Sequence, residues 1–306
     1  MKKCVVLYNP ESGRKKVIND QKIDEIKEVL TKHNYDSTVY KSKYKGAITD
    51  IVQSLDEDTD LVISIGGDGT FNESMKGNYN RDKRLVLAHI PMGTTNDVGK
   101  MYGYGNDLIK NLNMLLEGEL KEVDVCTIND EPFIYVAGFG KFLNIPYETS
   151  RKSKIALGYL AYIKKGFEEL FGRVKLYDIS YEVNGETHSG SYSVMLATNS
   201  TRIAGFKNIF LDTKLDDGKF EVLFCTIKKK KNILRSFLYL KTTDISNVEG
   251  YSYHKTDKLI IHNKKGIKII WDVDGEKKEI DTEDIVIKTT KTRLLLPSKN
   301  IQELFK

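Results

Sequence analysis

The stretch LVISIGGDGT, residues 61–70, decides the fold of this chain of 306 residues. Its first five residues are mostly apolar and predict a buried strand, and residues 71–75 begin a helical pattern. The three glycines between them let the backbone come close to a ligand, and N–H groups at such a turn favour a phosphate. Asp68 would repel that phosphate unless a cation, such as the Mg²⁺ of a nucleotide, lay between them. The stretch therefore predicts a phosphate-binding turn, and a purely structural glycine turn is the alternative.

Two more polar turns follow predicted strands. The segment NPESG, residues 9–13, follows strand 5–8, and PMGTTND, residues 91–97, follows strand 85–90. In an open α/β sheet, ligands bind beyond the carboxyl ends of the strands. We therefore expect all three turns to lie at one edge of a sheet and to form one site.

The first 120 residues alternate between strand and helix patterns, which predicts a parallel sheet flanked by helices. After about residue 125 strand patterns dominate and predict an antiparallel sheet, in which the sequence VNGE, residues 183–186, favours a tight hairpin because Asn-Gly accepts positive φ. The predicted strands of the first part are 3–8, 36–41, 61–65, 85–90 and 121–124, with helices at 20–33, 46–55, 70–78 and 107–116. The predicted strands of the second part are 125–138, 174–183, 187–198, 219–227, 258–263, 267–274 and 284–290, with helices near 154–171 and 230–241.

The three turns also carry a resemblance to a known family. In this order and spacing, the motifs NPESG, GGDGTFNE (residues 66–73) and GTTND (residues 93–97) resemble the catalytic domain of diacylglycerol kinases and related lipid kinases. The chain is most similar to the soluble bacterial enzymes, and the similarity continues to VDGE at residues 273–276, so it covers nearly the whole chain.

The resemblance and the strand pattern together imply an α/β protein of two domains. The first is a parallel-sheet nucleotide-binding domain over residues 1–124, completed by residues 292–306. The second is a mainly antiparallel, β-rich lipid-substrate domain over residues 125–291.

The acidic segment IWDVDGE, residues 270–276, is the second candidate for chemistry. In an extended strand Asp272 and Asp274 face one way, and Glu276 joins them if the strand continues past Gly275. Such clusters mark functional sites but also occur on solvated faces. The resemblance implies that residues 274–276 belong to the catalytic motif. We assign Asp274 as the general base that accepts the proton of a lipid hydroxyl, with Glu276 as the alternative base.

The resemblance further implies an ATP site with Mg²⁺. Asp68 is the candidate Mg²⁺ ligand, Asp97 extends the acidic network from the neighbouring strand end, and Asp124 joins it from the next one. Asp68 and Asp97 are therefore expected to take part in catalysis beside the acids of the 274–276 segment. The expected nucleotide-binding residues are Asn9, Pro10, Glu11, Ser12, Gly13, Ser42, Gly66, Gly67, Asp68, Gly69, Thr70, Asn72, Gly93 and Thr94.

The segment KLDDGK, residues 214–219, is the third candidate. Asp-Gly favours a tight turn, which is the structural interpretation of this segment. The resemblance implies instead a structural Mg²⁺ loop, with the carboxylate of Asp217 and the backbone carbonyls of Lys214 and Lys219 as ligands. Oxygen ligands of this kind suit Mg²⁺.

Composition limits the compartment and the partners. No apolar run approaches the ~20 residues that span a bilayer, and the N-terminus reads as a first strand and not as a signal peptide. Cys4, Cys126 and Cys225 are far apart and odd in number, so a reducing cytoplasm fits. Residues 1–120 hold 17 basic and 18 acidic residues, whereas the remainder holds 31 basic and 25 acidic residues. This basic excess favours an anionic membrane surface, and solvated lysines are the alternative.

We therefore expect an ATP-dependent kinase that phosphorylates diacylglycerol or a related lipid to give, from diacylglycerol, phosphatidic acid. It would be cytoplasmic and would touch the inner face of the membrane transiently, through Lys164 and Lys165 of the helix near 154–171 as the first candidates. We expect no nucleic-acid partner and allow for a homodimer. The alternatives are a kinase of another lipid alcohol and a non-catalytic regulator that binds nucleotide or lipid on the same fold.

Overall fold

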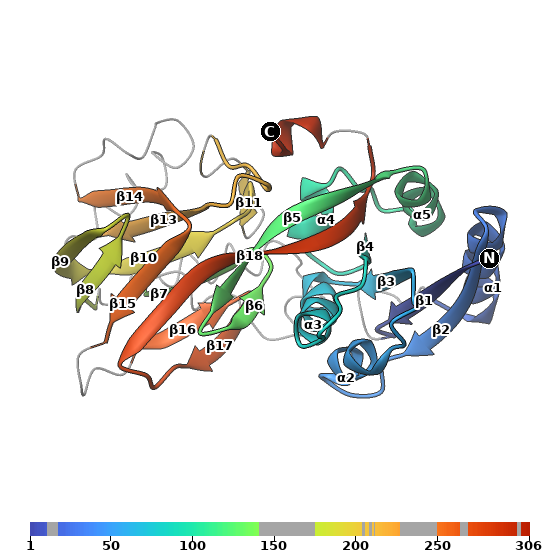
Figure 1. Cartoon of the computed structure of the whole chain (residues 1–306), viewed down its shortest axis with the longest axis horizontal. Coiled ribbons are helices and arrows are strands. Elements are labelled where there is room, and N and C mark those ends of the chain that lie inside the picture. Colours follow the sequence, from blue (N-terminus) through green and yellow to red (C-terminus); the bar gives the residue numbers. More distant parts are fainter. Residues whose placement is uncertain are drawn as a thin grey trace. The chain divides into compact units, whose positions relative to one another are not determined.

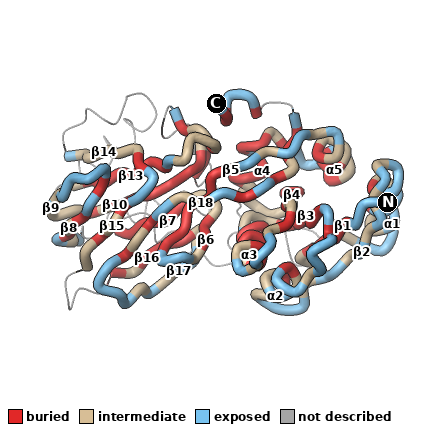
Figure 2. Tube along the Cα trace, viewed as in Figure 1, coloured by how far each residue is buried: buried red, intermediate tan, exposed pale blue. Residues whose placement is uncertain are grey.

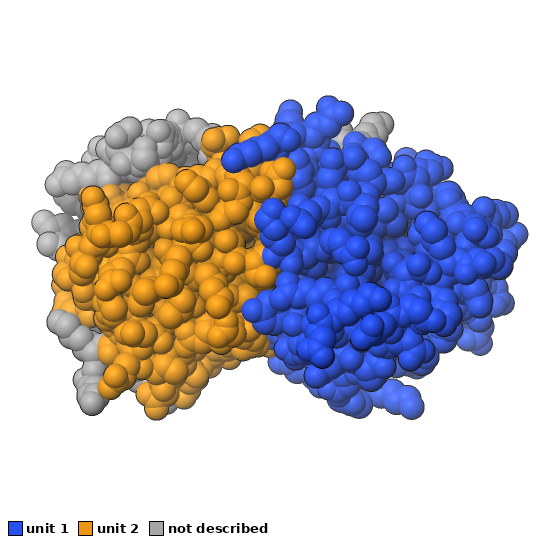
Figure 3. Space-filling model, viewed as in Figure 1, with its two compact units in different colours: residues 1–123, 291–306 blue, residues 124–290 orange. Residues whose placement is uncertain are grey.

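The structure is a computed structural model that describes residues 1–10, 18–140, 175–203, 206–207, 210, 212–226, 250–263, 269–298 and 301–306. Within this part the chain forms two compact units, one of residues 1–123 and 291–306 and one of residues 124–290 (Figure 3). The first is an α/β unit and the second is built from β-strands, so the predicted fold class is confirmed. The predicted helices near 154–171 and 230–241 lie outside the described residues.

The first unit is built on a parallel sheet in the order β2-β1-β3-β4 (Figure 1). The strands are β1 (Lys2–Tyr8), β2 (Tyr35–Lys41), β3 (Leu61–Gly66) and β4 (Leu87–Pro91), and the last part of β18 (Asp284–Leu296) pairs beside β4. Every residue of β3 and β4 is buried, whereas the residues of β2 alternate between intermediate and exposed and its last two are exposed (Figure 2). Strands covered on both faces read as continuous apolar runs, which is why β3 was readable from the sequence.

The helices of the first unit follow the strands in the predicted order. They are α1 (Asp20–Lys32), α2 (Ala47–Ser54), α3 (Asp68–Tyr79), α4 (Asp97–Met101) and α5 (Leu108–Leu116). Asn19 caps α1 by accepting the N–H of Lys22, and Asp107 caps α5 by accepting the N–H of Lys110. The five-residue helix α4 was not predicted, because so short a helix shows no apolar period.

The second unit contains two layers of antiparallel strands. One sheet has the order β14-β13-β10-β7-β16-β17, and the other contains β18, β15, β8 and β9, with β5 paired to β18 and β6 paired to β5 (Figure 1). A single core lies between them and includes Phe139, Phe224 and Trp271 from the first sheet and Tyr181 and Leu259 from the second. The strands are β5 (Glu119–Ile128), β6 (Glu131–Phe133), β7 (Val136–Gly140), β8 (Tyr177–Val183), β9 (Glu186–Tyr192), β10 (Val194–Thr198), β11 (Arg202–Ile203), β12 (Phe206–Lys207), β13 (Phe220–Cys225), β14 (Tyr251–Thr256), β15 (Lys258–His262), β16 (Ile270–Val273) and β17 (Glu276–Glu279).

Three hairpins in the described part of this unit turn through two residues with positive φ. The Asn184-Gly185 hairpin has φ values of 52° and 81° and joins β8 to β9, as predicted. The same backbone occurs at Asn129-Asp130, with φ of 46° and 65°, and it splits the predicted strand 125–138 into β5 and β6. Asn, Asp and Gly tolerate this left-handed region, so each pair stops a strand and reverses the chain.

The third of these hairpins corrects the prediction for the acidic segment. Asp274 and Gly275 have φ of 52° and 82° and form the turn between β16 and β17. Asp274 is therefore not the continuation of an extended strand with its side chain beside that of Asp272, as the alternation had predicted. The Asp-Gly pair was a turn signal that outweighed the apolar run before it.

Two further strand predictions need correction. The predicted strand 187–198 is interrupted at Ser193, and its halves β9 and β10 belong to different sheets. The strand β14 was not predicted, because its sequence YSYHKT lacks a clear apolar alternation. In the structure its first five residues have only intermediate burial.

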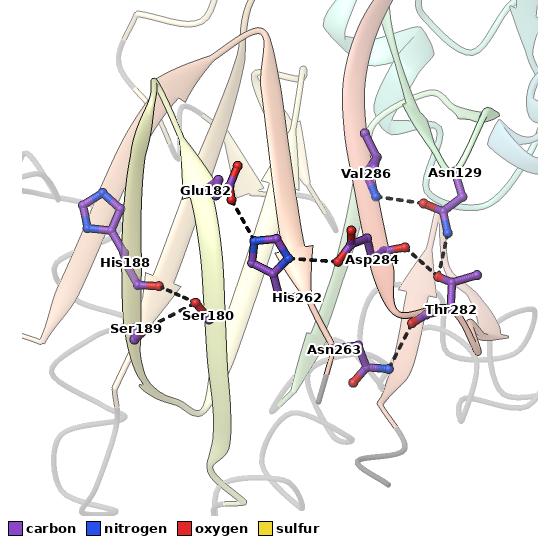
Figure 4. A network of polar contacts seen from close by, with 10 residues as sticks. All are labelled: Asn129, Ser180, Glu182, His188, Ser189, His262, Asn263, Thr282, Asp284 and Val286. Atoms are coloured by element: carbon purple, nitrogen blue, oxygen red, sulfur yellow. Dashed lines mark hydrogen bonds and ion pairs between the residues drawn. The ribbon is translucent and has the colours of Figure 1, made fainter. Parts of the chain in front are cut away.

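His262 ties three adjacent strands of the second unit together. Its Nδ1 lies 2.9 Å from Oδ1 of Asp284 on β18, and its Nε2 lies 3.1 Å from Oε1 of Glu182 on β8 (Figure 4). The hydrogen bond to Asp284 is the main cause of a raised pKa of His262, and the Glu182 carboxylate adds to it. Such cross-strand pairs stabilise neighbouring strands of a sheet.

Because the pKa of His262 is higher in the folded protein, its ion pairs should stabilise the fold most at low pH. The contribution is fully present below the unfolded pKa of about 6.5 and is lost as the pH rises through the higher folded value. His262→Gln should therefore lower the free energy of unfolding more at about pH 6 than at about pH 9, by less than about 1 kcal/mol for so exposed a site. Urea unfolding of wild type and variant at both pH values measures this. A Glu182→Gln, Asp284→Asn double variant is the control and should also lose the pH dependence; an equal loss in His262→Gln at both pH values would contradict the prediction.

Candidate active site

The turns that follow β1, β3 and β4 are joined by backbone contacts in the first unit. The N–H of Met92 donates to the carbonyl of Gly66 at 2.5 Å, and the N–H of Asn9 donates to the carbonyl of Ile65 at 3.3 Å. Ser42 joins them from the end of β2, where its N–H donates to the carbonyl of Tyr8 at 2.9 Å. The structure thus brings the described predicted nucleotide residues of these turns to one sheet edge, whereas Glu11, Ser12 and Gly13 lie outside the described residues.

Glycines let two of these turns touch. A Cβ on Gly93 would lie 2.5 Å from Cα of Gly67, and a Cβ on Gly66 would lie 2.3 Å from Oγ1 of Thr70. Both positions therefore need glycine for close packing. Gly69 is different, because a Cβ there would meet no atom within 4 Å. Packing within the described structure gives Gly69 no reason to be glycine, and its outer side is open to a ligand.

Two acidic side chains of α3 complete the N-termini of neighbouring helices. Asp68 accepts the N–H of Asp97 at 3.0 Å and the N–H of Val98 at 3.2 Å, at the first turn of α4. Glu73 accepts the N–H of Gly46 at 3.0 Å and the N–H of Ile48 at 3.3 Å, at the start of α2. A carboxylate at a helix N-terminus satisfies free donors and interacts favourably with the helix dipole. Sequence reasoning missed Glu73, although it lies within the GGDGTFNE motif.

The N-terminus of α3 itself has no such side-chain cap. Its N-cap residue is Gly67, which has no side chain, and no side-chain hydrogen bond caps it among the described residues. Gly69, the second residue of α3, lies in this first turn and has an open side. A helix N-terminus with N–H donors and an open approach is a site for a phosphate group.

Asp97 and Asn96 shape the turn that faces this helix end. Asn96 has a φ of 54°, its Oδ1 accepts the N–H of Gly93 at 2.7 Å, and its Nδ2 donates to the Gly93 carbonyl at 3.0 Å. Asp97 follows in the first turn of α4 and is 2% exposed. The two predicted acids of this unit are therefore linked, because the Asp68 carboxylate binds the backbone of Asp97.

Asp124, Asp217 and Glu221 form a second acidic group, which lies in the second unit. Asp124 is buried on β5, and its Oδ2 accepts the N–H of Gly218 at 2.5 Å. Asp217 accepts the N–H of Lys219 at 3.0 Å, which confirms a tight turn at the predicted position. Glu221 is 1% exposed, and burial raises its pKa to about 7, although the nearby Lys255 ammonium opposes the shift.

Lys255 supplies a cation to this group. Its Nζ lies 2.8 Å from Oδ2 of Asp217 and 3.6 Å from Oε1 of Glu221, and it donates to the carbonyl of Asp212 at 2.8 Å. Asp217 and the Asp212 carbonyl lie within hydrogen-bond distance of the ammonium group, whereas Glu221 adds an ion pair at the longer distance. The hydrogen bond to Asp217 and the charge of Glu221 raise the pKa of Lys255 against the effect of its burial.

The contacts of the two predicted metal sites, the loop of residues 214–219 and the pair Asp68 and Asp97, differ. The Asp217 carboxylate has the Lys255 ammonium as a counter-ion, so its charge is offset without a metal, and the structural Mg²⁺ loop with Lys214 and Lys219 stays a prediction. In the part of the chain that the structure describes, no three Asp, Glu, His or Cys side chains form a group able to hold a metal ion. Asp68 and Asp97 remain suited to a metal that arrives with a nucleotide, because the phosphates of the nucleotide would supply further oxygen ligands.

The Asp274 carboxylate is held by three successive backbone donors. Its Oδ2 accepts the N–H of Ile134 at 2.7 Å, and its Oδ1 accepts the N–H of Tyr135 at 3.0 Å and that of Val136 at 3.1 Å. The N–H of Asp274 in turn donates to the Val136 carbonyl at 2.9 Å. Charge-assisted bonds of this kind fix the position and the negative charge of the carboxylate.

The acids next to Asp274 are placed differently. Asp272 is 1% exposed, and its Oδ1 accepts the N–H of Gly275 at 2.9 Å, so it braces the turn. Glu276 is exposed at the start of β17.

Burial raises the pKa of Cys126 well above its usual range, and the charges of Glu221, Asp124 and Asp274 add to this effect. These three acids therefore lie in one region of the second unit.

The three cysteines are chemically quiet in the structure. All are free and buried, and burial raises the pKa of Cys4 to about 12. A thiol so rarely ionised is a poor nucleophile. Cysteine chemistry is therefore not part of this candidate site.

Comparisons with known proteins agree with the motifs. The family model described as the diacylglycerol kinase catalytic domain matches residues 3–128. A diacylglycerol kinase of Staphylococcus saprophyticus is 33% identical over 233 residues, which are 76% of this chain and 74% of that relative. A diacylglycerol kinase of Staphylococcus aureus is 34% identical over 233 residues, which are 76% of this chain and 72% of that relative.

A solved structure agrees with the fold over most of the chain. The crystal structure of a diacylglycerol kinase from Bacillus anthracis has a TM-score of 0.75 at 19% identity and covers 96% of this chain and 97% of that chain. At this identity the likeness concerns the fold. Among the described residues, no helix is long and apolar enough to cross a membrane.

The Lys255 contacts predict how this loop responds to Mg²⁺. Lys255→Met removes the counter-ion of Asp217 and Glu221 and should destabilise the protein by less than the about 3–5 kcal/mol typical of a fully buried pair. Without nucleotide, Mg²⁺ should leave the melting temperature of wild type unchanged but raise that of Lys255→Met, because the vacated position can accept a cation. Calorimetry with EDTA and with Mg²⁺ measures both.

Lys288→Met is the matched control, since Lys288 pairs with the exposed Asp130 in the same unit. It should show a small loss of stability and no response to Mg²⁺. A wild type that Mg²⁺ stabilises, with the effect lost in Asp217→Ala, would instead establish the structural Mg²⁺ loop.

Proposed function

Because the chain belongs to the diacylglycerol kinase family and is a lipid kinase, we propose that it transfers the γ-phosphate of ATP to the hydroxyl of diacylglycerol and releases phosphatidic acid and ADP. The N-terminus of α3 carries this proposal. It lies at the sheet edge where the turns after β1, β3 and β4 meet. It lacks a side-chain cap among the described residues, and no protein atom blocks the approach of a ligand at Gly69. These features favour a polyphosphate ligand.

The phosphates would lie against the turns of residues 9–13, 66–72 and 93–94, and Ser42 borders the same edge. Mg²⁺ bound with the nucleotide would offset the charge of the transferring phosphoryl group. Asp68 and Asp97 would hold it. The Asp68 carboxylate is kept in place by two N–H groups of α4, so its position does not depend on the metal.

The acceptor hydroxyl needs a base. As its oxygen bonds to the γ-phosphorus, the bond from that phosphorus to the β–γ bridging oxygen breaks, and the hydroxyl proton passes to a carboxylate. We assign this carboxylate to Asp274, because three backbone donors fix it in one orientation. Glu276 is the alternative base, and its exposure leaves it less fixed.

The acceptor and the membrane contact extend the proposal. Diacylglycerol is the first acceptor to test, and another lipid alcohol is the alternative. The basic excess after residue 120 favours peripheral contact with anionic lipid at the inner face of the membrane, in a cytoplasmic enzyme. Lys164 and Lys165, the first candidates for this contact, lie outside the described residues, and a homodimer would be compatible with it.

Gly69→Ala tests whether the α3 N-terminus binds the nucleotide. The added methyl group meets no protein atom, and alanine is a better helix former than glycine by about 1 kcal/mol, so stability should be equal or higher. The same methyl group would enter the space of the phosphates, and the Kd of Mg·ATP should rise about tenfold or more, the result of about 1.4 kcal/mol of lost contact. Isothermal titration and thermal unfolding measure the two effects.

Gly93→Ala is the contrasting variant, because its methyl group would lie 2.5 Å from Cα of Gly67 and should destabilise the fold. If Gly69→Ala binds Mg·ATP as wild type does, the phosphates do not lie at this helix end.

Asp274→Asn tests the base. The variant should lose about 10²–10⁴ in kcat while its Kd for Mg·ATP changes little. The assay uses labelled ATP and a panel of lipid alcohols in mixed micelles, which also identifies the acceptor. Since an amide nitrogen cannot accept the backbone donors, unfolding is measured in parallel, and activity is compared at a temperature where the variant is folded.

Glu276→Gln is the companion variant for this test. Wild-type turnover in Asp274→Asn, together with a loss in Glu276→Gln, would move the base to Glu276. Loss in Asp274→Asn with little effect in Glu276→Gln is the expected result.

A further inference from the structure

The peptide group between Tyr135 and Val136 lies between Asp274 and a second side chain. Its N–H, on Val136, donates to Oδ1 of Asp274 at 3.1 Å. Its carbonyl, on Tyr135, accepts a hydrogen bond from the hydroxyl of Thr198. Donation to the carbonyl of a peptide polarises its N–H, so the two hydrogen bonds strengthen each other. One peptide thus connects the Thr198 hydroxyl to the carboxylate assigned as the base.

Thr198 is held firmly in this position. It is the last residue of β10, is 0% exposed, and pairs with Val136 of β7 in the antiparallel register. Its branched side chain has restricted rotation in a strand, and a buried hydroxyl needs a hydrogen-bond partner. The rigid hydroxyl therefore fixes the plane of the Tyr135–Val136 peptide.

We propose that Thr198 is a positioning residue for the phosphoryl-transfer reaction, acting through the Tyr135–Val136 peptide on the carboxylate of Asp274. The proposal rests on the assignment of Asp274 as the base. Thr198 keeps the peptide N–H directed at Oδ1 and strengthens its donation. The first effect holds the carboxylate in the orientation that accepts the proton of the lipid hydroxyl. The second keeps the carboxylate ionised, and so able to act as the base, at lower pH.

A purely structural threonine would give a different pattern of effects. If the hydroxyl only satisfied a buried carbonyl, its loss would lower stability and would leave the pH dependence of the reaction unchanged. If it acts on Asp274, its loss weakens the donation to Oδ1, so the carboxylate is protonated more easily. The acidic limb of the pH profile of kcat then moves to higher pH.

Four variants separate these outcomes. Thr198→Val keeps the shape and removes the hydroxyl, whereas Thr198→Ser keeps the hydroxyl and removes the methyl group. Thr198→Ala differs from Thr198→Ser only by the hydroxyl, so the comparison of these two stands even if Thr198→Val fails to fold. Thr256→Val is the control, because Thr256 is also buried in this unit and donates to the carbonyl of Lys258 at 2.8 Å.

The expected result is a fall in kcat for Thr198→Val and Thr198→Ala, up to about the 10²-fold that a small misplacement costs, with KM for Mg·ATP unchanged. Their acidic limbs move to higher pH, whereas Thr198→Ser stays close to wild type. Thr256→Val loses stability and keeps the wild-type profile.

Two results would overturn the proposal and are distinguishable. If Asp274→Asn is folded, binds Mg·ATP as wild type does and is inactive, but Thr198→Val and Thr198→Ala keep the wild-type kcat and pH profile, Thr198 is only structural and the assigned base stands. If Asp274→Asn turns over like wild type, the base assignment fails and the positioning role fails with it.

Discussion

The N-termini of helices are the constraint on which the first unit depends. Each helix presents backbone N–H groups without partners inside the helix, and these groups need acceptors when they are buried. In this unit α3 supplies two of the acceptors, since Asp68 serves α4 and Glu73 serves α2. Its own N-cap is a glycine. Under the proposed function this helix end, which has no side-chain cap among the described residues, would bind the phosphates of the nucleotide. The glycines at positions 66, 67 and 93 let the surrounding backbone approach closely at this edge.

The second unit holds its acids by the same means, with turns in place of helix ends. Asp274 lies in a left-handed turn and receives two N–H groups from the linker between β6 and β7 and a third from the first residue of β7. Asp124 receives the N–H of Gly218, and Asp217 receives that of Lys219. Backbone donors cannot rotate away as side chains do, so each carboxylate has one orientation. An acid of this kind is already positioned before a substrate arrives, and such preorganisation is what electrostatic catalysis requires.

Local features of the sequence predicted much of this arrangement. The apolar run of β3, the glycine turn after it and the Asn184-Gly185 hairpin each depend on neighbouring residues, and each was found. The acidic segment failed because Asp274-Gly275 carries two local signals, an apolar strand before it and a turn pair within it, and only the pairing of β16 with β17 shows that the turn prevails. The partners of the acids could not be predicted, because Asp68 binds N–H groups about 30 residues away and Asp274 binds N–H groups about 140 residues away. Lys255 was likewise found only when β14 placed it beside Asp217.

Because these carboxylates hold the backbone and are also proposed to act in the reaction, removing one changes two properties at once. An alanine at Asp68 would leave the first turn of α4 without its acceptor, and an alanine at Asp274 would leave three donors without theirs. Loss of activity in either variant is therefore compatible with a structural role alone. The sites that separate the two roles are those where the fold has no need of the group, and Gly69 is such a site, because its missing side chain contacts nothing in the described structure. The proposed chemistry is therefore tested most directly at positions next to the acidic residues. Gly69 is such a position beside Asp68, and Thr198 is such a position beside the peptide that binds Asp274.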